Sequence, residues 1–444
     1  MDAVTTPTAF PHPPLDLKLT DHPQRLALSN EAHARPYALM LTPSRVTHIA
    51  YLHRNLSPAQ ELWLYGELAL RFGKTPPKTG DNHYNADLGP CRIKWARHGE
   101  FSALTVITPG LDAHAPFAEP ALATLPEEWR QQLPGNVLMA AHALLLPQVE
   151  MPVGWQTISS KYFDGNDLIG AEIGEGAGMA YTDFRIHEDG FSRYVIADRY
   201  MGRRQGGRML QRLFEIDTYR MMAFLALPLA KSISPELTEA DRELAELTSA
   251  MQQAKQADEP ILLDRLTQLA GRIESALSRT DYRFSAAHAY YEIVKSRISE
   301  LREVRIHGLQ PFQQFMERRL SPAMDTCNAV ARRQRELAAR VSRATALLRT
   351  RVDVTREQQN QELLTSMERR ATLQLRLQET VEGLSIAAIT YYTIGLLGYG
   401  FKGLKAAGVG LNVEVATALS IPVVAGLIAL GLRRMRQALM KEHG

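Results

Sequence analysis

Two uncharged apolar runs near the C-terminus decide the fold class: residues 384–401 read LSIAAITYYTIGLLGYGF and residues 415–432 read VATALSIPVVAGLIALGL. As a helix, each 18-residue run rises roughly 27 Å at about 1.5 Å per residue, close to the ~30 Å hydrocarbon core of a bilayer. Two buried core helices of a soluble protein would have the same composition. These runs, however, stand in tandem between charged flanks, so they predict a transmembrane hairpin.

The charges beside the runs predict their orientation. Before the first run stand Arg369, Arg370 and Arg376, and after the second run stand Arg433, Arg434, Arg436 and Lys441. The charged residues of the connecting loop are Lys402, Lys405 and Glu414. Because segments rich in Lys and Arg stay on the cytoplasmic side, both ends of the hairpin are expected in the cytoplasm. The first residues, MDAVTTPTAFPHPPLDLKL, do not read as a signal peptide, which agrees with a cytoplasmic N-terminal part.

A long helix is predicted ahead of the hairpin. Residues 323–382 contain neither Gly nor Pro, and Ser321-Pro322 supplies a capping hydroxyl followed by a proline suited to a first turn. A heptad seam, weaker beyond its last member, is formed by Val341, Thr345, Leu348, Val352 and Thr355. We therefore expect a coiled-coil-like stalk that continues directly into the first membrane run.

The chain between residues 206 and 320 also has helical periodicity. One helix is predicted over residues 206–233, Pro235 and Pro260 are each expected to open another, and a further one carries an apolar stripe from Ala287 to Leu301. These stripes indicate a bundle core within the chain, and a seam between subunits is the alternative.

Residues 30–205 predict an α/β domain with a mostly antiparallel or mixed sheet. Short runs rich in β-formers are separated by turn signals, and Asp189-Gly190 between two such runs is typical of a hairpin. The runs are residues 45–52, 92–95, 102–108, 169–173, 180–186 and 192–197, with helices expected over 58–72 and 126–133.

Composition narrows the function classes. A formal net charge of +3 over 444 residues is too small to indicate a nucleic-acid partner. Cys91 and Cys327, the two cysteines, exclude a disulfide framework and a Cys-rich metal site. No cofactor is predicted. Two interpretations of His48, His53, His83 and His98 stay open: they are surface or structural residues, or some of them form a metal site.

Three polar segments are candidates for chemistry. Gly174-Glu175-Gly176-Ala177-Gly178 lies between two strands and is predicted to be a hairpin loop, with phosphate binding as the alternative. Alternation places Asp183, Arg185 and His187 on one sheet face, as a solvated ion-pair cluster or a functional one. The third segment gathers amide, acid, imidazole and guanidinium groups before a strand: Asn30, Glu31, His33 and Arg35. No catalytic arrangement is legible, and the chain is not expected to be an enzyme.

Four strings in order resemble a bacterial domain of unknown function, number 3422, whose members are described as predicted membrane-anchored proteins. The strings are NEAHARP, TDFRIHEDGFSRYVIAD, RMLQRLFEIDTYRMMAFLALPLA and QLRLQETVEGLSIAAITYYTIG. The resemblance covers about residues 20 to 435 and implies a location in the bacterial inner membrane. It carries no activity to transfer.

The layout also resembles the CorA-type magnesium channels, in which a cytoplasmic α/β domain, a long stalk helix, two C-terminal spans and a basic tail assemble as a pentamer. That family ends its first span with Tyr-Gly-Met-Asn, where this chain has Tyr399-Gly400-Phe401-Lys402. The resemblance implies a pore mouth at these residues, with Asn412 further along the loop. A lysine there would repel Mg²⁺, so the expected pore is not necessarily magnesium-selective.

The predicted fold is therefore an α/β N-terminal domain, a long-helix bundle and stalk, and a C-terminal transmembrane hairpin of CorA-like layout. The expected parts are a tail (1–29), the α/β domain (30–205), a helical bundle (206–320), the stalk (321–383), the hairpin (384–432) and a basic cytoplasmic tail (433–444). The expected partners are the lipid bilayer and further copies of the chain. The first hypothesis is a homo-oligomeric inner-membrane pore or transport scaffold. The alternative is a cytoplasmic binding or enzyme module that the hairpin only anchors.

Overall fold

The computed structural model describes residues 21–442 except residues 27, 30–35, 54–55, 112–115, 409 and 411, with side chains as far as residue 434. The chain divides into two compact units. The first comprises Met1–Leu247 and Leu266–Ser342, and the second comprises Thr248–Arg265 and Arg343–Gly444.

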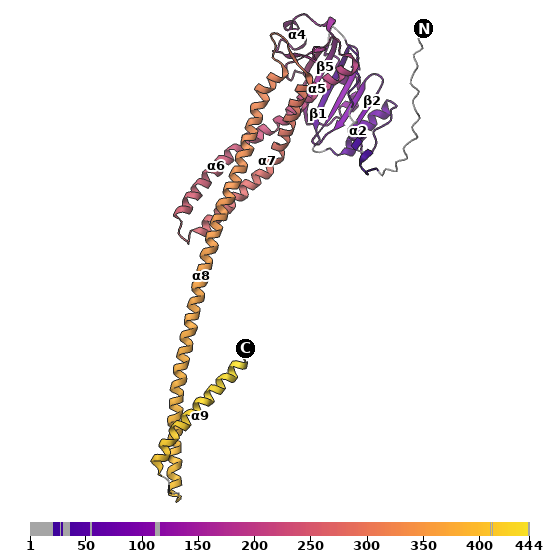
Figure 1. The fold of residues 1–444 in the computed structure, drawn as a ribbon. Coiled ribbons are helices and arrows are strands. Elements are labelled where there is room, and N and C mark those ends of the chain that lie inside the picture. The colour runs from indigo at the N-terminus through magenta and orange to yellow at the C-terminus, as the bar shows by residue number, and fades with distance from the viewer. Residues whose placement is uncertain are drawn as a thin grey trace, which may run out of the picture. The chain divides into compact units, whose positions relative to one another are not determined.

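A mixed sheet forms the centre of the first unit (Figure 1). Among the described residues it has nine strands in the order β2-β3-β4-β1-β5-β8-β7-β6-β9, and β5 and β8 are the one parallel pair. Its strands are β1 (Ser44–Leu52), β2 (His83–Asp87), β3 (Arg92–Arg97), β4 (Phe101–Pro109), β5 (Val137–Pro147), β6 (Ile169–Ile173), β7 (Gly178–Thr182), β8 (Ser192–Asp198) and β9 (Val304–Arg305). The predicted α/β region with a mixed sheet is confirmed.

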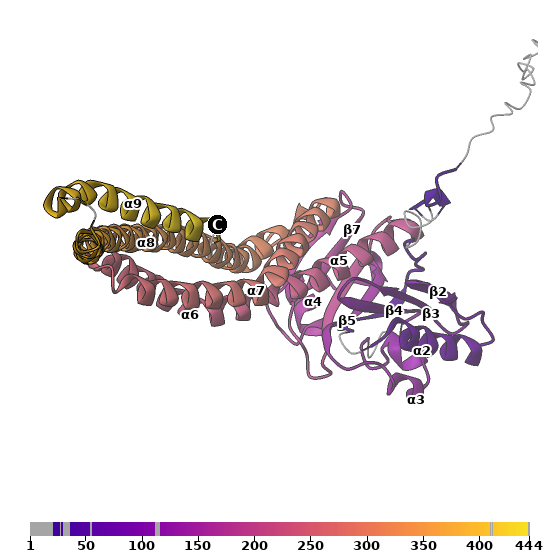
Figure 2. The ribbon, with the colours of Figure 1, turned by 90° about the horizontal axis from the view of Figure 1, so that it is seen from below.

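Helices cover both faces of this sheet (Figure 2). On one face lie α2 (Pro58–Arg71), α3 (Glu127–Arg130) and α4 (Trp155–Tyr162), and on the other lies α5 (Gly202–Phe224). Ile93 and Trp95 of β3 alternate toward α2, where they join one hydrophobic core. The side chains between them therefore point toward α5, because successive residues of a strand face opposite sides.

The remaining described elements are helical. They are two short 3₁₀ helices, η1 (Ala121–Thr124) and η2 (Gln148–Glu150), and the long helices α6 (Ala226–Gln253), α7 (Glu259–Leu301), α8 (Phe312–Ala406) and α9 (Val413–Glu442). The single helix α8 confirms the prediction that the stalk continues into the first membrane run, and α7 begins at Pro260 within one residue.

The helix predicted over residues 206–233 is two helices, because α5 ends at Phe224 and α6 begins at Ala226. Two predicted helix starts are also wrong. Pro322 and Pro235 lie inside α8 and α6 instead of opening them. The first turn of α8 has another cap, because the Glu303 carboxylate accepts the backbone N–H groups of Phe312 at 3.0 Å and Gln313 at 2.9 Å. A carboxylate that satisfies free N–H groups at the positive end of a helix stabilises a start there, ten residues upstream of the proline.

In the second unit, Arg351 of α8 is bonded to the chain around residues 251–259. Its guanidinium donates to the Met251 carbonyl oxygen at 3.1 Å and lies 2.7 Å from the nearly buried Glu259 carboxylate. Of the described helices, α8 and α9 (over Val413–Arg434) are long and apolar enough to cross a membrane, and their most apolar stretches are not buried by the chain itself. These two helices indicate that the protein associates with a membrane.

Candidate ligand cavity

A cavity of about 120 Å³ lies between α5 and the sheet face formed by β3, β4 and β1. Most of its lining is apolar, and its polar side chains come from both walls. On the sheet, Lys94, Thr105 and His48 are direct cross-strand neighbours on β3, β4 and β1, so they form one polar row across the floor. On α5, the polar residues that line the cavity include Gln211, Glu215 and Thr218.

Lys94 is a partly buried cation that lines this cavity. Its Nζ donates to the Pro36 carbonyl oxygen at 2.7 Å and to Gln211 Oε1 at 3.1 Å. Burial lowers the pKa of Lys94 to about 8, although the nearby Glu215 carboxylate opposes the shift. An ammonium group has three donors, so two are used by the chain and one remains for a ligand.

The charge of Glu215 is taken up by the chain. Gln211 Nε2 donates to its Oε1 at 2.8 Å, and the Arg297 guanidinium of α7 pairs with its Oε2. Arg297 also donates to Glu300 at 2.5 Å, which ties α7 to the same network. The anion on the α5 wall therefore already has a cation as its partner.

His48 is a neutral group in this cavity at physiological pH. Its ring stacks on Phe214 with 4.7 Å between centroids, and its Nδ1 lies 2.8 Å from Thr105 Oγ1. Burial, reinforced by the positive charges of His98 and Lys94, lowers the pKa of His48 to about 3. A second stacked pair, His98 on Phe101 with 4.5 Å between centroids, also lines the cavity.

The segment before β1 closes one side of the cavity. Pro36, Ala38 and Met40 line it, and the Met40 N–H donates to the Arg203 carbonyl oxygen at 3.0 Å. Gly207 of α5 faces this segment so closely that a Cβ there would collide with the Ala38 carbonyl oxygen. The glycine is thus required by the close approach of two backbones.

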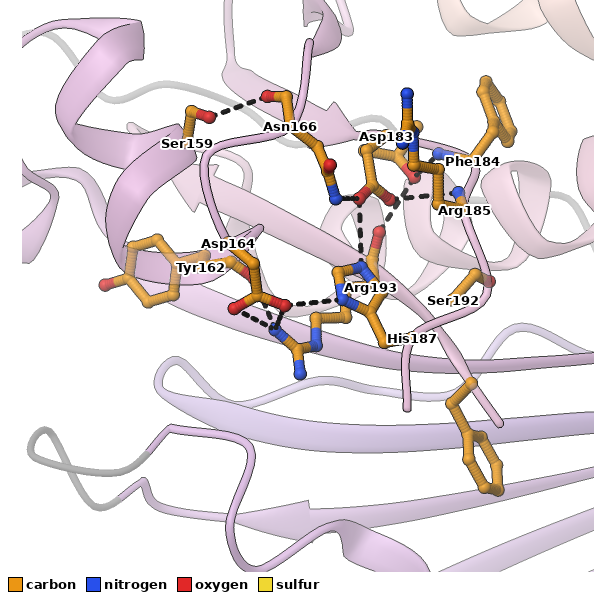
Figure 3. Close-up of polar contacts among 12 residues, drawn as sticks. Ser159, Tyr162, Asp164, Asn166, Asp183, Phe184, Arg185, His187, Ser192 and Arg193 are labelled. Carbon is orange, nitrogen blue, oxygen red and sulfur yellow. Dashed lines mark hydrogen bonds and ion pairs between the residues drawn. The ribbon is translucent and has the colours of Figure 1, made fainter. Parts of the chain in front are cut away.

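A separate polar cluster surrounds His187 (Figure 3). His187 Nδ1 lies 2.9 Å from Asp164 and Nε2 lies 3.0 Å from the buried Asp183 carboxylate. Asn166 and Arg193 add donors to the two acids, at 2.9 Å to Asp183 and 3.1 Å to Asp164. The hydrogen bond from His187, together with the Arg193 charge, lowers the pKa of Asp164. Both carboxylates thus have donors from the chain itself, and the cluster connects the loop after α4 with the loop after β7.

Alternation predicted that Asp183, Arg185 and His187 share one face of a strand, and this prediction is wrong. β7 ends at Thr182, and the next residue but one, Phe184, has a positive φ of 51° that no extended strand allows. Asp183 and His187 nevertheless lie together, whereas Arg185 contributes its backbone N–H to Asp183 at 3.1 Å.

The other predicted positions are placed as follows. Asn30, Glu31, His33 and Arg35 lie outside the described residues. The glycine-rich segment is the predicted hairpin loop, since Ile173 pairs with Gly178. Tyr399, Gly400, Phe401 and Lys402 lie in the last turns of α8, where the Lys402 ammonium stands 5.6 Å from the Tyr399 ring centroid, and Asn412 directly precedes α9.

Sequence reasoning missed the cavity but named three of its histidines. His48, His83 and His98 were candidates for a metal site, and all three line the cavity. In the described part of the chain, no group of three or more His, Cys, Asp or Glu side chains is arranged to hold a metal ion. Lys94 and Gln211 carried no signal, because their meeting depends on how α5 packs on the sheet.

A comparison with protein families identifies the chain. The family described as "Protein of unknown function (DUF3422)" matches residues 20–439, so the chain belongs to this family. No curated protein and no solved structure is significantly similar to it.

Proposed function

We propose that this DUF3422 protein is a multi-pass protein of the bacterial inner membrane whose cytoplasmic α/β unit binds a small ligand in the cavity under α5. The observation that carries the proposal is a mostly apolar cavity of about 120 Å³ that is lined by the partly buried Lys94. Ligand sites are typically concave, mostly apolar and equipped with a few placed polar groups. The cavity under α5 has all three properties.

The membrane part of the proposal rests on α8 and α9. Their apolar stretches are unburied by the chain, and such surfaces are costly in water but favourable in lipid. The arginines on both sides of the hairpin favour a cytoplasmic location for both termini. The hairpin would then keep the binding unit at the cytoplasmic surface of the membrane.

Binding is favoured over catalysis by the state of the charged groups. Glu215 is paired with Arg297, and His48 is stacked on Phe214 with its Nδ1 bonded to Thr105. A general base needs a free proton acceptor directed at the substrate. The Glu215 carboxylate is instead engaged by the Arg297 guanidinium, and the Nδ1 of His48 by Thr105.

The test uses the full chain in detergent and two fluorinated probes built on a single benzene ring, 4-fluorobenzamide and 4-fluorobenzoate. Fluorine NMR of the native protein should show binding of at least one probe. Ala103→Leu, which fills the cavity from β4, should abolish that binding. Ala123→Leu, on an exposed position outside the cavity, should leave it intact and controls for partition into micelles. Equal signals from all three proteins would contradict a ligand site under α5.

A second candidate function, the homo-oligomeric pore of CorA-like build, is favoured by one observation. Every residue from 356 to 381 of α8 is exposed, including Leu363, Met367, Leu377 and Val381. The spacing of four residues between Leu363 and Met367, and between Leu377 and Val381, puts the apolar side chains of each pair on one stripe of the helix, as in a seam between subunits.

Two measurements test the pore. A mass measurement of the solubilised protein should give several copies per particle, and a monomer would exclude a pore made of two-span subunits. If Lys402 lies at a pore mouth, Lys402→Asn should change the ion preference of flux into vesicles. Identical leak-level flux from both proteins would leave the hairpin as an anchor.

A further inference from the structure

We infer that the ligand of this cavity is a small monocarboxylate with a compact, ring-sized apolar body, bound with its carboxylate on the polar row Lys94–Thr105–His48. The inference rests on the proposed function and specifies the chemical class of the ligand. It follows from the size of the cavity, from the balance of charge inside it and from a count of its available protons.

Size limits the apolar body. The cavity measures about 120 Å³, and a dry protein cavity of about 150 Å³ holds one benzene molecule. The stacked pairs His48–Phe214 and His98–Phe101 present flat walls to such a ring. Aromatic rings prefer offset or edge contacts with other rings, which these walls can provide.

Charge requires an anion. The Lys94 ammonium is surrounded by a carbonyl oxygen and an amide oxygen, neither of which neutralises it. The Glu215 carboxylate, whose charge acts on Lys94, is already paired with Arg297. A partly desolvated cation that shares its neighbouring carboxylate with an arginine is stabilised further by a bound carboxylate. A neutral ligand would leave the imbalance unchanged.

Proton counting supplies a second donor. A neutral imidazole carries one N–H and a threonine one O–H, and the bond between His48 and Thr105 uses one of the two protons. If Thr105 donates to Nδ1, then His48 keeps an Nε2–H; if Nδ1–H donates, then Thr105 keeps its O–H. The contact of Nε2 with Thr218 is 3.5 Å, longer than a normal N–H···O bond. One donor of the pair therefore remains available in either tautomer.

The two donors are neighbours. Lys94 and Thr105 stand opposite each other on antiparallel strands, as do Thr105 and His48, and such positions are about 5 Å apart at Cβ. A carboxylate has two oxygens, so one can accept from Lys94 and the other from the Thr105–His48 pair. An amide of the same shape places an NH₂ group against one of these donors.

The experiment compares 4-fluorobenzoate with 4-fluorobenzamide at pH 7 on the full chain in detergent. The native protein should bind the carboxylate at least about tenfold more tightly, as expected when a charge-assisted hydrogen bond replaces a neutral one. Lys94→Met removes the charge at similar length and should abolish this preference. Lys78→Met makes the same charge change on an exposed lysine outside the cavity and should retain it.

The outcomes separate the inference from the proposed function. Equal binding of the two probes by the native protein, or an unchanged preference in Lys94→Met, would overturn the carboxylate while the cavity remained a ligand site. Binding of neither probe would overturn both. If Lys94→Met does not fold, Lys94→Gln removes the charge while it keeps a hydrogen-bond donor, and an unchanged preference there would overturn the inference.

Discussion

The backbone of Gly207 on α5 packs directly against the carbonyl group of Ala38, with no space between them for a side chain. This contact joins the segment before β1 to α5 and so positions the Pro36 carbonyl oxygen, which accepts a hydrogen bond from Lys94 at 2.7 Å. A small residue at one position of a helix therefore controls the wall of the cavity.

Gly207→Ala should destabilise the first unit by about 1–3 kcal/mol, the usual cost of overpacking, and weaken ligand binding because the segment must move. Gly271→Ala is the matched control, since a Cβ there meets open space on the exposed side of α7. The control should raise stability by up to about 1 kcal/mol. Chemical denaturation measures both, and equal effects of the two substitutions would show that the close contact does not exist.

Carboxylate affinity should depend on pH through Lys94. The pKa of this lysine is lowered to about 8, and only the ammonium form attracts an anion. The affinity for 4-fluorobenzoate should therefore fall about tenfold between pH 7 and pH 9, while the probe itself stays ionised. Titrations at pH 6, 7, 8 and 9 measure the profile, and Lys94→Met should give a flat one. A flat profile in the native protein would show that the charge of Lys94 does not contribute to anion binding.

Acid should destabilise the first unit through its buried histidines. Burial lowers the pKa of His48 to about 3 and that of His142 to about 4. In the unfolded chain these groups take up protons below about pH 6.5, so the unfolded state binds more protons than the folded state and stability falls as the pH drops below 6.5. Each histidine should cost on the order of 2 kcal/mol by pH 5.

The variant His48→Gln tests this expectation through the pH dependence of the unfolding free energy. Its unfolding free energy should fall less steeply below pH 6.5 than that of the native protein, because the contribution of His48 is gone. His288→Gln, on an exposed position of α7, should keep the native pH dependence. An unaltered slope in His48→Gln would mean that this histidine is protonated in the folded state.

Proline at position 352 should disrupt α8. Val352 is buried and lies far from either end of the helix, next to Arg351 with its bonds to Met251 and Glu259. Val352→Pro removes a backbone donor and should cost roughly 3 kcal/mol or more. Circular dichroism and the mass of the solubilised particle measure the result. Val352→Ala, which keeps the backbone, separates lost packing from lost helix, and normal assembly of the proline variant would exclude a stalk that joins subunits.

The orientation of the hairpin is tested by reporter fusions. Fusions at residue 444 and within residues 406–410 should report opposite compartments, with residue 444 in the cytoplasm. A periplasmic signal from the fusion at residue 444 would contradict the proposed topology.

Local sequence patterns predicted the elements that do not depend on contacts with distant parts of the chain. The uncharged runs 384–401 and 415–432, and the 60 residues without Gly or Pro before them, predicted the apolar parts of α8 and α9 and the continuity of α8. Most strands were predicted from β-forming runs between turn signals. β5 was not predicted, because its sequence VLMAAHALLLP lies at the centre of the sheet and is mostly apolar on both faces, so the alternation that marks a strand disappears.

The cavity was decided by tertiary structure alone. The row Lys94–Thr105–His48 exists only because β3, β4 and β1 pair in one register, and Gln211 reaches Lys94 only because α5 packs on that face, 117 residues along the chain. Residues that meet across strands or across a helix–sheet contact have no fixed spacing in the sequence, so periodicity does not reveal them. The sequence by itself thus determined most of the helical and extended segments and those apolar enough for a membrane, and packing over long separations determined where a ligand can bind.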